Sequence, residues 1–226
     1  RLDQIQTELD HTLSGRPPDQ LLWTRLAEVH SVFTLQRGPM DELIDGARWD
    51  LSGRSVESEE DLVHYSNLVG GSIGAMMLPL LGLSADTRVQ QQARDLGIGM
   101  QITNILRDVG EDLHTLNRSY LPTSMLETFG VDPSSSDTRT TSYRLMMESL
   151  MSMAEGYFES GMNGIEALPF GMRPGIRAAS LFYREILNEV RANDYDNVSR
   201  RAYVPNRRKL LALVPGGYER RKQKLV

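Results

Sequence analysis

The sequence of 226 residues contains no cysteine. This absence excludes a disulfide scaffold, a thiolate zinc site and a cysteine nucleophile, so any bound metal must use oxygen or imidazole ligands. Lysine is almost absent too, because only Lys209, Lys222 and Lys224 occur among the 25 basic residues. Arginine supplies the rest. It is the residue best suited to bidentate contacts with phosphates and carboxylates, although a GC-rich genome would produce the same bias.

Long apolar runs are also missing. The longest, near Ile73–Leu83 and Leu210–Val214, are well short of the roughly 20 residues that a membrane-spanning helix needs. Acidic residues outnumber basic ones, 30 to 25, which gives a net charge of −5 and does not indicate a nucleic-acid partner. The chain begins at Arg1 without a signal-peptide pattern, so we expect a processed or truncated piece of a longer protein.

Apolar residues recur at three- and four-residue spacing along most of the chain, which predicts an all-α helical bundle. We expect residues 1–226 to form a single domain. The loop-like stretch Gly130–Thr141 is expected to be an exposed connection, and Arg220–Lys224 a frayed basic end. The expected helices are Leu2–Leu13, one restarting after Pro17-Pro18, Met40–Leu51, one capped by Ser58 and ending at Leu80, Thr87–His114, Tyr143–Leu168, Arg173–Asn193 and Arg200–Leu213.

One segment, Gly97–Asp112, carries the residues most suited to chemistry. On a helix, Gln101, Asn104, Asp108 and Asp112 fall within an arc of roughly 80°. The two carboxylates lie one turn apart and repel each other unless a cation sits between them. Carboxylate and amide oxygens favour magnesium or manganese. A solvated acidic helix end is the plain alternative, but the amides and the glycines of this segment favour a ligand site.

Arg118 and Tyr120 follow the aspartates after a short interval, and an arginine there can bind a phosphate that the metal also holds. Because magnesium usually binds through carboxylates together with substrate phosphates, the residues alone predict a metal-dependent enzyme acting on a phosphate or diphosphate. They do not identify its substrate.

Four ordered blocks resemble the squalene/phytoene synthase family. They are Asp45–Leu51 (DGARWDL), Tyr65–Gly74 (YSNLVGGSIG), the run NILRDVGED from Asn104 to Asp112 with the following R-x-YLP, and Ala192–Val204 (ANDYDNVSRRAYV). The third block is similar to the family's second aspartate-rich motif. The last block favours the phytoene synthase branch over squalene synthase.

This resemblance implies an isoprenoid-synthase-type bundle around a central tunnel and a magnesium-dependent prenyltransferase. The implied reaction joins two geranylgeranyl diphosphates head to head into phytoene through a cyclopropyl diphosphate, the first step of carotenoid synthesis. An apolar product implies peripheral membrane contact, in a plastid for a plant or alga and at the cytoplasmic membrane for a bacterium. The implied roles are Asp108 and Asp112 as metal carboxylates, Asn104 and Gln101 as further catalytic residues, and Arg107, Arg118, Tyr120, Tyr65, Tyr195 and Arg48 as substrate-binding residues.

The family's first aspartate-rich motif, of the form DELVD, is expected upstream of the region matched by Leu2–Pro18, so half of the metal site would be absent. Asp41–Asp45 (DELID) reads like that motif, but its register places it one helix later, and we expect Asp41 and Asp45 not to be the first metal cluster. Three alternatives stay open: a C30 dehydrosqualene or squalene-type synthase, a non-catalytic relative acting as an assembly module, and an unrelated all-α magnesium pyrophosphohydrolase for nucleotides. Donor chain length and oligomeric state are also left open.

Overall fold

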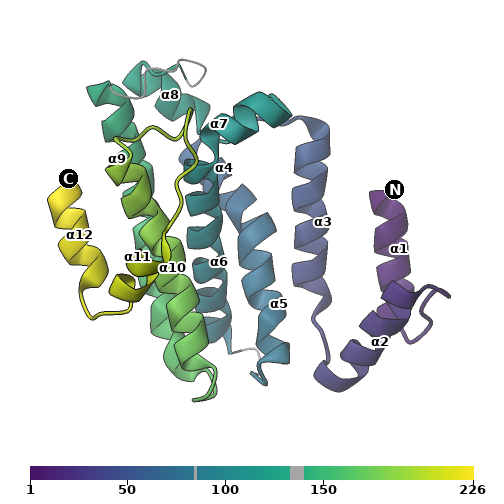
Figure 1. The fold of residues 1–226 in the computed structure, drawn as a ribbon. Coiled ribbons are helices and arrows are strands. Elements are labelled where there is room, and N and C mark those ends of the chain that lie inside the picture. Colours follow the sequence, from purple (N-terminus) through teal and green to yellow (C-terminus); the bar gives the residue numbers. More distant parts are fainter. Residues whose placement is uncertain (84–85, 133–139) are drawn as a thin grey trace.

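A computed structural model describes residues 1–83, 86–132 and 140–226, and every regular element among them is a helix (Figure 1). This confirms the predicted all-α fold. In chain order the elements are α1 (Leu2–Leu13), α2 (Leu21–Phe33), α3 (Arg37–Ser52), α4 (Glu59–Ser66), the π-helix η1 (Asn67–Gly71), α5 (Ser72–Leu80), α6 (Thr87–Arg107), α7 (Val109–Glu111), the π-helix η2 (Asp112–Leu116), α8 (Thr123–Phe129), α9 (Thr141–Asn163), the 3-10 helix η3 (Gly164–Ala167), α10 (Arg173–Ala192), α11 (Asn206–Ala212) and α12 (Gly217–Leu225).

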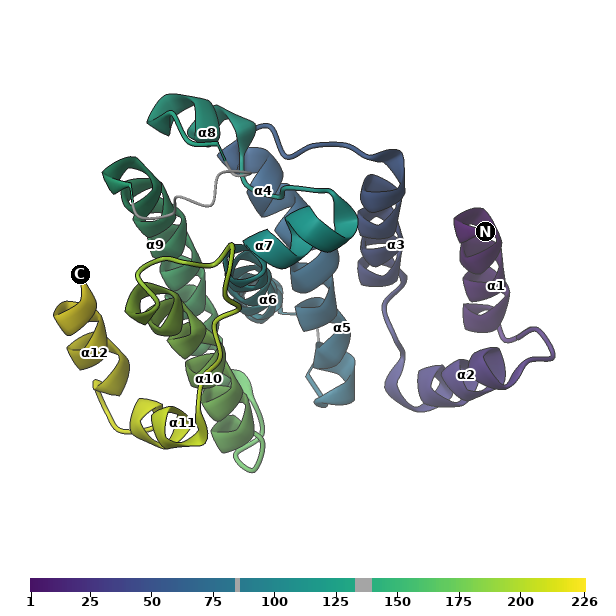
Figure 2. The same ribbon diagram turned by 45° about the horizontal axis from the view of Figure 1, so that its top comes forward.

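Helix α6 runs through the middle of the bundle, packed along α9 and flanked by α5 and α10 (Figures 1 and 2). Its inward side chains Ile98, Ile102 and Leu106 are buried against the apolar face of α9. That face is rich in methionine, whose flexible side chain fills irregular gaps between helices. The α9 residues of this core are Met146, Met147, Leu150 and Met151.

Glycine allows α6 to approach η1 at backbone distance. A Cβ atom added to Gly97 would lie 2.1 Å from the carbonyl oxygen of Gly70, and one added to Gly70 would lie 2.4 Å from the carbonyl oxygen of Gly97. Any larger residue at either position would therefore push the two segments apart. The predicted helix from the Ser58 cap to Leu80 is interrupted by η1 at this contact, while the cap itself forms, with Ser58 Oγ accepting from the Asp61 N–H at 3.1 Å.

The N-terminal helices α1 and α2 lie at the edge of the molecule, beyond α3 (Figures 1 and 2). Helix α1 has the predicted bounds. The helix restarting after Pro17-Pro18 also forms as α2, but Leu21, Leu22 and Val32 are 68–74% exposed, so most of its apolar face has no partner among the residues described.

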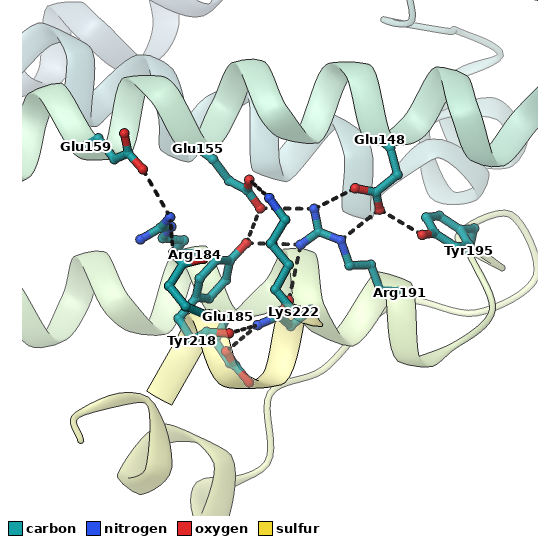
Figure 3. A network of polar contacts seen from close by, with 11 residues as sticks. Glu148, Glu155, Glu159, Arg184, Glu185, Arg191, Tyr195, Tyr218 and Lys222 are labelled. Carbon is teal, nitrogen blue, oxygen red and sulfur yellow. Dashed lines mark hydrogen bonds and ion pairs between the residues drawn. The ribbon is translucent and has the colours of Figure 1, made fainter. Parts of the chain in front are cut away.

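The predicted frayed end at Arg220–Lys224 is wrong, because these residues belong to α12, which packs on α10 (Figure 3). Tyr218 is buried at this contact, Arg221 pairs with Glu189 at 2.8 Å, and Lys222 pairs with Glu155. The carboxylates on α9 and α10 thus neutralise a basic run that would otherwise remain solvated. The predicted element Arg200–Leu213 is shorter than expected, because the chain is helical only from Asn206.

The remaining boundaries differ by a few residues. The predicted helix Tyr143–Leu168 is present as α9 followed by η3. Helix α8 ends at Phe129 and is followed by Gly130, whose positive φ of 61° is a conformation that glycine adopts without strain. The predicted exposed connection Gly130–Thr141 falls mostly on residues 133–139, which lie outside the described part of the chain.

Candidate functional site

The two aspartates predicted to bind metal lie at a break in the helical backbone. Helix α6 ends at Arg107, Asp108 has φ −104° and ψ 15°, and the chain resumes as α7 and η2. The continuous helix predicted from Thr87 to His114 is therefore interrupted at Asp108, although the residues that follow are again helical. The one-turn spacing survives, because the backbone N–H of Asp112 donates to the carbonyl oxygen of Asp108 at 2.8 Å.

Two arginines hold the Asp108 carboxylate. Nε of Arg107 and Nε of Arg201 donate to its Oδ1 atom at 2.7 and 2.8 Å. Burial alone would raise the pKa of Asp108, but the two arginines outweigh burial and hold this pKa below its usual value. Asp108 is therefore ionised at neutral pH and is flanked by two guanidinium groups that can bind other anions.

Asp112 has the opposite surroundings. Within the described residues, no side chain donates a hydrogen bond to its carboxylate. Burial, followed by the negative charges of Asp108 and Glu111, raises the pKa of Asp112 to about 6. A cation beside the two aspartates would offset this unfavourable charge.

A third aspartate, Asp50 of α3, gathers three of the predicted substrate-binding residues. Its Oδ1 atom accepts hydrogen bonds from the Tyr65 and Tyr120 hydroxyls at 3.1 and 2.9 Å, and Nη1 of Arg118 lies 3.4 Å away. The two tyrosine rings stack, with centroids 5.1 Å apart. Burial, with the Asp50 charge, raises the pKa of Tyr65, so this hydroxyl stays protonated. The backbone N–H of Arg118 donates to the Asp112 carbonyl at 3.1 Å, which joins this cluster to the aspartate pair.

Gln101 and Asn104 line an apolar cavity of about 340 Å³ one to two turns before the helix break. Nδ2 of Asn104 lies 3.4 Å from Oε1 of Gln101, whereas Oδ1 of Asn104 is buried and has no hydrogen-bond partner in the described part of the chain. A buried acceptor without a donor is costly, so this oxygen points to a ligand. The rest of the lining comes from η1, α5, α6, the end of α9, η3, α10 and the residues that follow α5 and η3, and includes Met77, Leu81, Met100, Ile165 and Leu168.

The structure does not bring Arg48 and Tyr195 to this place. Arg48 is directed toward α1 and pairs with Asp3 and, at 2.9 Å, with Asp45. Tyr195 is buried between α9 and α10, where its hydroxyl donates to Glu148 at 2.7 Å (Figure 3). Neither residue lines the cavity or contacts the aspartate pair.

The DELID segment also lies in an ion-paired surface. Asp41 accepts a hydrogen bond from Nε of Arg37 at 2.8 Å and another from Gln6 at 2.9 Å. Asp45 is paired with Arg48. Both carboxylates therefore have partners, Asp41 on α1 and α3 and Asp45 on α3, and their exclusion from the first metal cluster stays a prediction.

Sequence reasoning did not assign Asp50 and Arg201 to the site. Both lie inside blocks that carried the family resemblance, DGARWDL and ANDYDNVSRRAYV, so a signal for them was present. Tyr120 lies 70 residues from Asp50 and Arg201 lies 93 residues from Asp108 along the chain, and helical periodicity gives no information about contacts over such separations.

The family profile described as "Squalene/phytoene synthase" matches residues 1–208. Phytoene synthase 3, chloroplastic, from Zea mays is 38% identical over 226 residues, which cover 97% of this chain and 52% of that protein. Phytoene synthase 2, chloroplastic, from Solanum lycopersicum is 34% identical and is covered to 72% of its length. The chain thus spans about half the length of the maize relative.

Solved structures agree with these matches. A dehydrosqualene synthase determined in complex with a ligand has a TM-score of 0.83 at 30% identity, covering 99% of this chain and 77% of that one. Squalene synthase HpnC from Alicyclobacillus acidocaldarius shares the fold, with a TM-score of 0.79 at 23% identity over 86% of this chain and 74% of that one. These results exclude an unrelated nucleotide pyrophosphohydrolase. The chain belongs to the squalene/phytoene synthase family, as its four sequence blocks predict.

Proposed function

We propose that this chain is the core of a phytoene synthase, which joins two geranylgeranyl diphosphates head to head into phytoene through a cyclopropyl diphosphate. The observation that carries the proposal is the position of Asp108 and Asp112 at the end of the helix whose Asn104 lines the apolar cavity. A prenyl diphosphate has the same two-part chemistry, with an anionic head and a long hydrocarbon tail. Phytoene formation would be the first step of carotenoid synthesis.

The residues at this end of α6 fit a magnesium or manganese ion. Among the described residues, Oδ1 of Asn104 has no hydrogen-bond donor, and the pKa of Asp112 is raised, so these two groups could each gain from a cation. We expect Asp108, Asp112 and Asn104 to hold the metal, with Gln101 fixing the Asn104 amide. Bound metal would supply charge neutralisation for the diphosphate leaving group. No third carboxylate or imidazole joins the pair among the described residues, and magnesium commonly completes its coordination with substrate phosphates and water.

The chain's own cations would hold the diphosphate. Arg107 and Arg201 bring two guanidinium groups to one point, and guanidinium binds phosphate oxygens in bidentate geometry. Asp50 fixes the orientation of Arg118 and of the Tyr120 hydroxyl. Burial raises the pKa of Tyr120, so its hydroxyl keeps the proton that it donates to Asp50. The apolar cavity would take hydrocarbon and keep water away from the reacting carbon atoms.

We also propose peripheral contact with an anionic bilayer through α11 and the turn that follows it. Exposed leucines beside cationic side chains are typical of helices that lie in a membrane interface. No helix of the described residues is long and apolar enough to cross a bilayer. The compartment would be the plastid in a plant or alga and the cytoplasm in a bacterium. The apolar side chains are 45–68% exposed, and the patch consists of Leu210, Leu211, Leu213, Val214, Arg207, Arg208 and Lys209.

Two variants of the proposal predict other outcomes. The first variant, which the similarity to a dehydrosqualene synthase supports, makes a C30 product from two farnesyl diphosphates. A non-catalytic relative that serves as an assembly module would convert neither donor. The proposal and its two variants share the fold and predict three different results: phytoene, a C30 hydrocarbon, or no product.

Incubation of the complete protein with geranylgeranyl diphosphate, with and without magnesium, tests the proposal. We expect phytoene in the organic extract, identified by its mass, only when the metal is present. A C30 hydrocarbon from farnesyl diphosphate and none from geranylgeranyl diphosphate would favour the dehydrosqualene variant. Absence of product from both donors, with the protein shown to be folded by circular dichroism, would overturn the proposed activity.

A further inference from the structure

The segment that connects α10 to α11 crosses the helix break that carries the two aspartates. It starts with two consecutive residues in the left-handed region, Asp194 and Tyr195, with φ 61° and 62°. This conformation is uncommon for non-glycine residues, and a bulky residue such as Tyr195 needs surrounding contacts to hold it there. Here the contact is the Tyr195 hydroxyl bound to Glu148, which is itself paired with Arg191 at 2.7 Å (Figure 3). The start of the segment is therefore anchored in the bundle.

Two residues later, Asn197 binds both sides of the break. Its side chain is 2% exposed, and its Nδ2 donates to the carbonyl oxygen of Leu106, at the end of α6. Its backbone carbonyl accepts from the N–H of Gly110, in α7, at 3.0 Å. The hydroxyl of Tyr143, on α9, donates to Oδ1 of Asn197 and fixes the orientation of the amide. Asp108 lies midway between the two backbone groups that Asn197 holds.

Close backbone approach accompanies these hydrogen bonds. A Cβ atom added to Gly110 would lie 1.8 Å from the carbonyl oxygen of Val198, so only glycine fits between the aspartates at this point. Four residues beyond Asn197, the Arg201 guanidinium binds the Asp108 carboxylate. One short segment thus contacts the backbone on both sides of Asp108 and the Asp108 side chain itself.

We propose that Asn197 is a positioning residue, which keeps the helix break at Asp108 and thereby aims Asp108 and Asp112 at a common metal ion. This inference rests on the proposed function. A purely stabilising role is the alternative. It predicts that loss of Asn197 lowers the stability of the fold without changing the metal affinity of the folded protein.

The test compares Asn197→Ala with Asn188→Ala. Asn188 is equally buried, and its Nδ2 donates to Glu185 at 3.0 Å and to the Tyr218 carbonyl at 3.3 Å, at the α10–α12 contact. Thermal unfolding gives the stability of each variant, and electron paramagnetic resonance gives the affinity for Mn²⁺ in the presence of inorganic pyrophosphate. We expect both variants to melt earlier, but only Asn197→Ala to bind Mn²⁺ about tenfold more weakly, as is usual when a group supporting metal ligands is lost.

Tyr143→Phe is a milder variant that removes only the hydroxyl fixing the Asn197 amide. It serves where Asn197→Ala does not fold, and we expect a loss of Mn²⁺ affinity of roughly threefold, smaller than that of Asn197→Ala because the Asn197 amide itself remains. Unchanged affinity in folded Asn197→Ala or Tyr143→Phe, or an equal loss in Asn188→Ala, would overturn the positioning role. Failure of the unaltered protein to bind Mn²⁺ with pyrophosphate would be a different result. It would overturn the proposed metal site, and the positioning role with it.

Discussion

The carboxylate end of α6 and the charged interface of α9, α10 and α12 are both rich in ionised groups, but only the interface is balanced. There, Arg191 pairs with Glu148 at 2.7 Å and with Glu155 at 3.0 Å, and Lys222 also pairs with Glu155 (Figure 3). Burial would raise the pKa of Glu155, but hydrogen bonds from Lys222 and Tyr218 hold it below its usual value. Every charge at the centre of the interface has an opposite partner, and the result is a helix contact.

At the carboxylate end, Asp108 has two arginine partners, but Asp112 has the pKa of a group whose charge is unfavourable. A carboxylate whose charge is unfavourable lowers the stability of the folded chain, and carboxylates of this kind are common at sites that bind ligands. The comparison teaches that two charged regions of one fold can differ in how completely their charges are paired, and the incompletely paired region is the one that we propose to bind a ligand.

The largest effect is expected from removing the unbalanced pair. The double variant Asp108→Ala/Asp112→Ala should lose prenyl transfer by about a thousandfold or more, because the proposed metal would have no carboxylate ligand. The product assay measures the rate, and circular dichroism should show the same helicity. Glu166→Ala, which removes a surface carboxylate paired with Arg173 and Arg177, is the matched control and should keep the rate. A fully active double variant would sink the assignment of the site.

Substitutions at the balanced interface of α9, α10 and α12 should lower the free energy of unfolding. Glu155→Gln leaves the Arg191 and Lys222 charges with one partner fewer, and we expect a loss of about 3 kcal/mol in the free energy of unfolding at pH 7. Glu159→Gln, one turn along α9 with a 68% exposed side chain, should change it by less than about 0.5 kcal/mol. Because the folded pKa of Glu155 is lowered, the difference should vanish as the pH falls through that pKa. Urea titration of both variants measures this, and equal effects would show that the interface is not a stabilising cluster.

A smaller and opposite effect is expected for Asp112→Asn in metal-free protein. The folded pKa of about 6 exceeds the ordinary 3.8, so the ionised carboxylate destabilises the fold above pH 6, and this penalty disappears as the pH falls toward 4. The variant should therefore be more stable by about 1–2 kcal/mol at pH 8 and no different near pH 4. Asp108→Asn should be less stable than the unaltered protein at pH 8, because the Asp108 pKa is lowered. Thermal melts across this pH range would contradict the account if both variants shifted in the same direction.

Local sequence information predicted much of this molecule. The bounds of α1, the Ser58 cap and the one-turn spacing of Asp108 and Asp112 depend on residues within a few positions of each other, and all three are found. The break after Arg107 was missed, because the contacts at it come from Asn197, which is 91 residues from Leu106. Helical periodicity continues through the break and gives no sign of it.

Contacts between distant helices account for the other differences. From the sequence alone, the basic run of α12 is predicted to be solvated. The prediction fails because carboxylates of α9 and α10, which are distant in sequence, pair with this run. The sequence around Asp50 gives no sign that the Tyr65 and Tyr120 hydroxyls donate to its carboxylate. The sequence blocks that resemble the family include Asp50 and Arg201. A matching block does not, however, identify which of its side chains contact other parts of the chain.

The most direct test of the unbalanced site is a pH titration of the Asp112 carboxyl group by carbon NMR, assigned with Asp112→Asn and repeated with magnesium and inorganic pyrophosphate. Without them, the Asp112 pKa should lie at about 6. With them, it should fall by more than one unit, since a bound cation favours the ionised form, while Glu155 should not shift. An Asp112 pKa that stays near 6 after both are added would contradict the account.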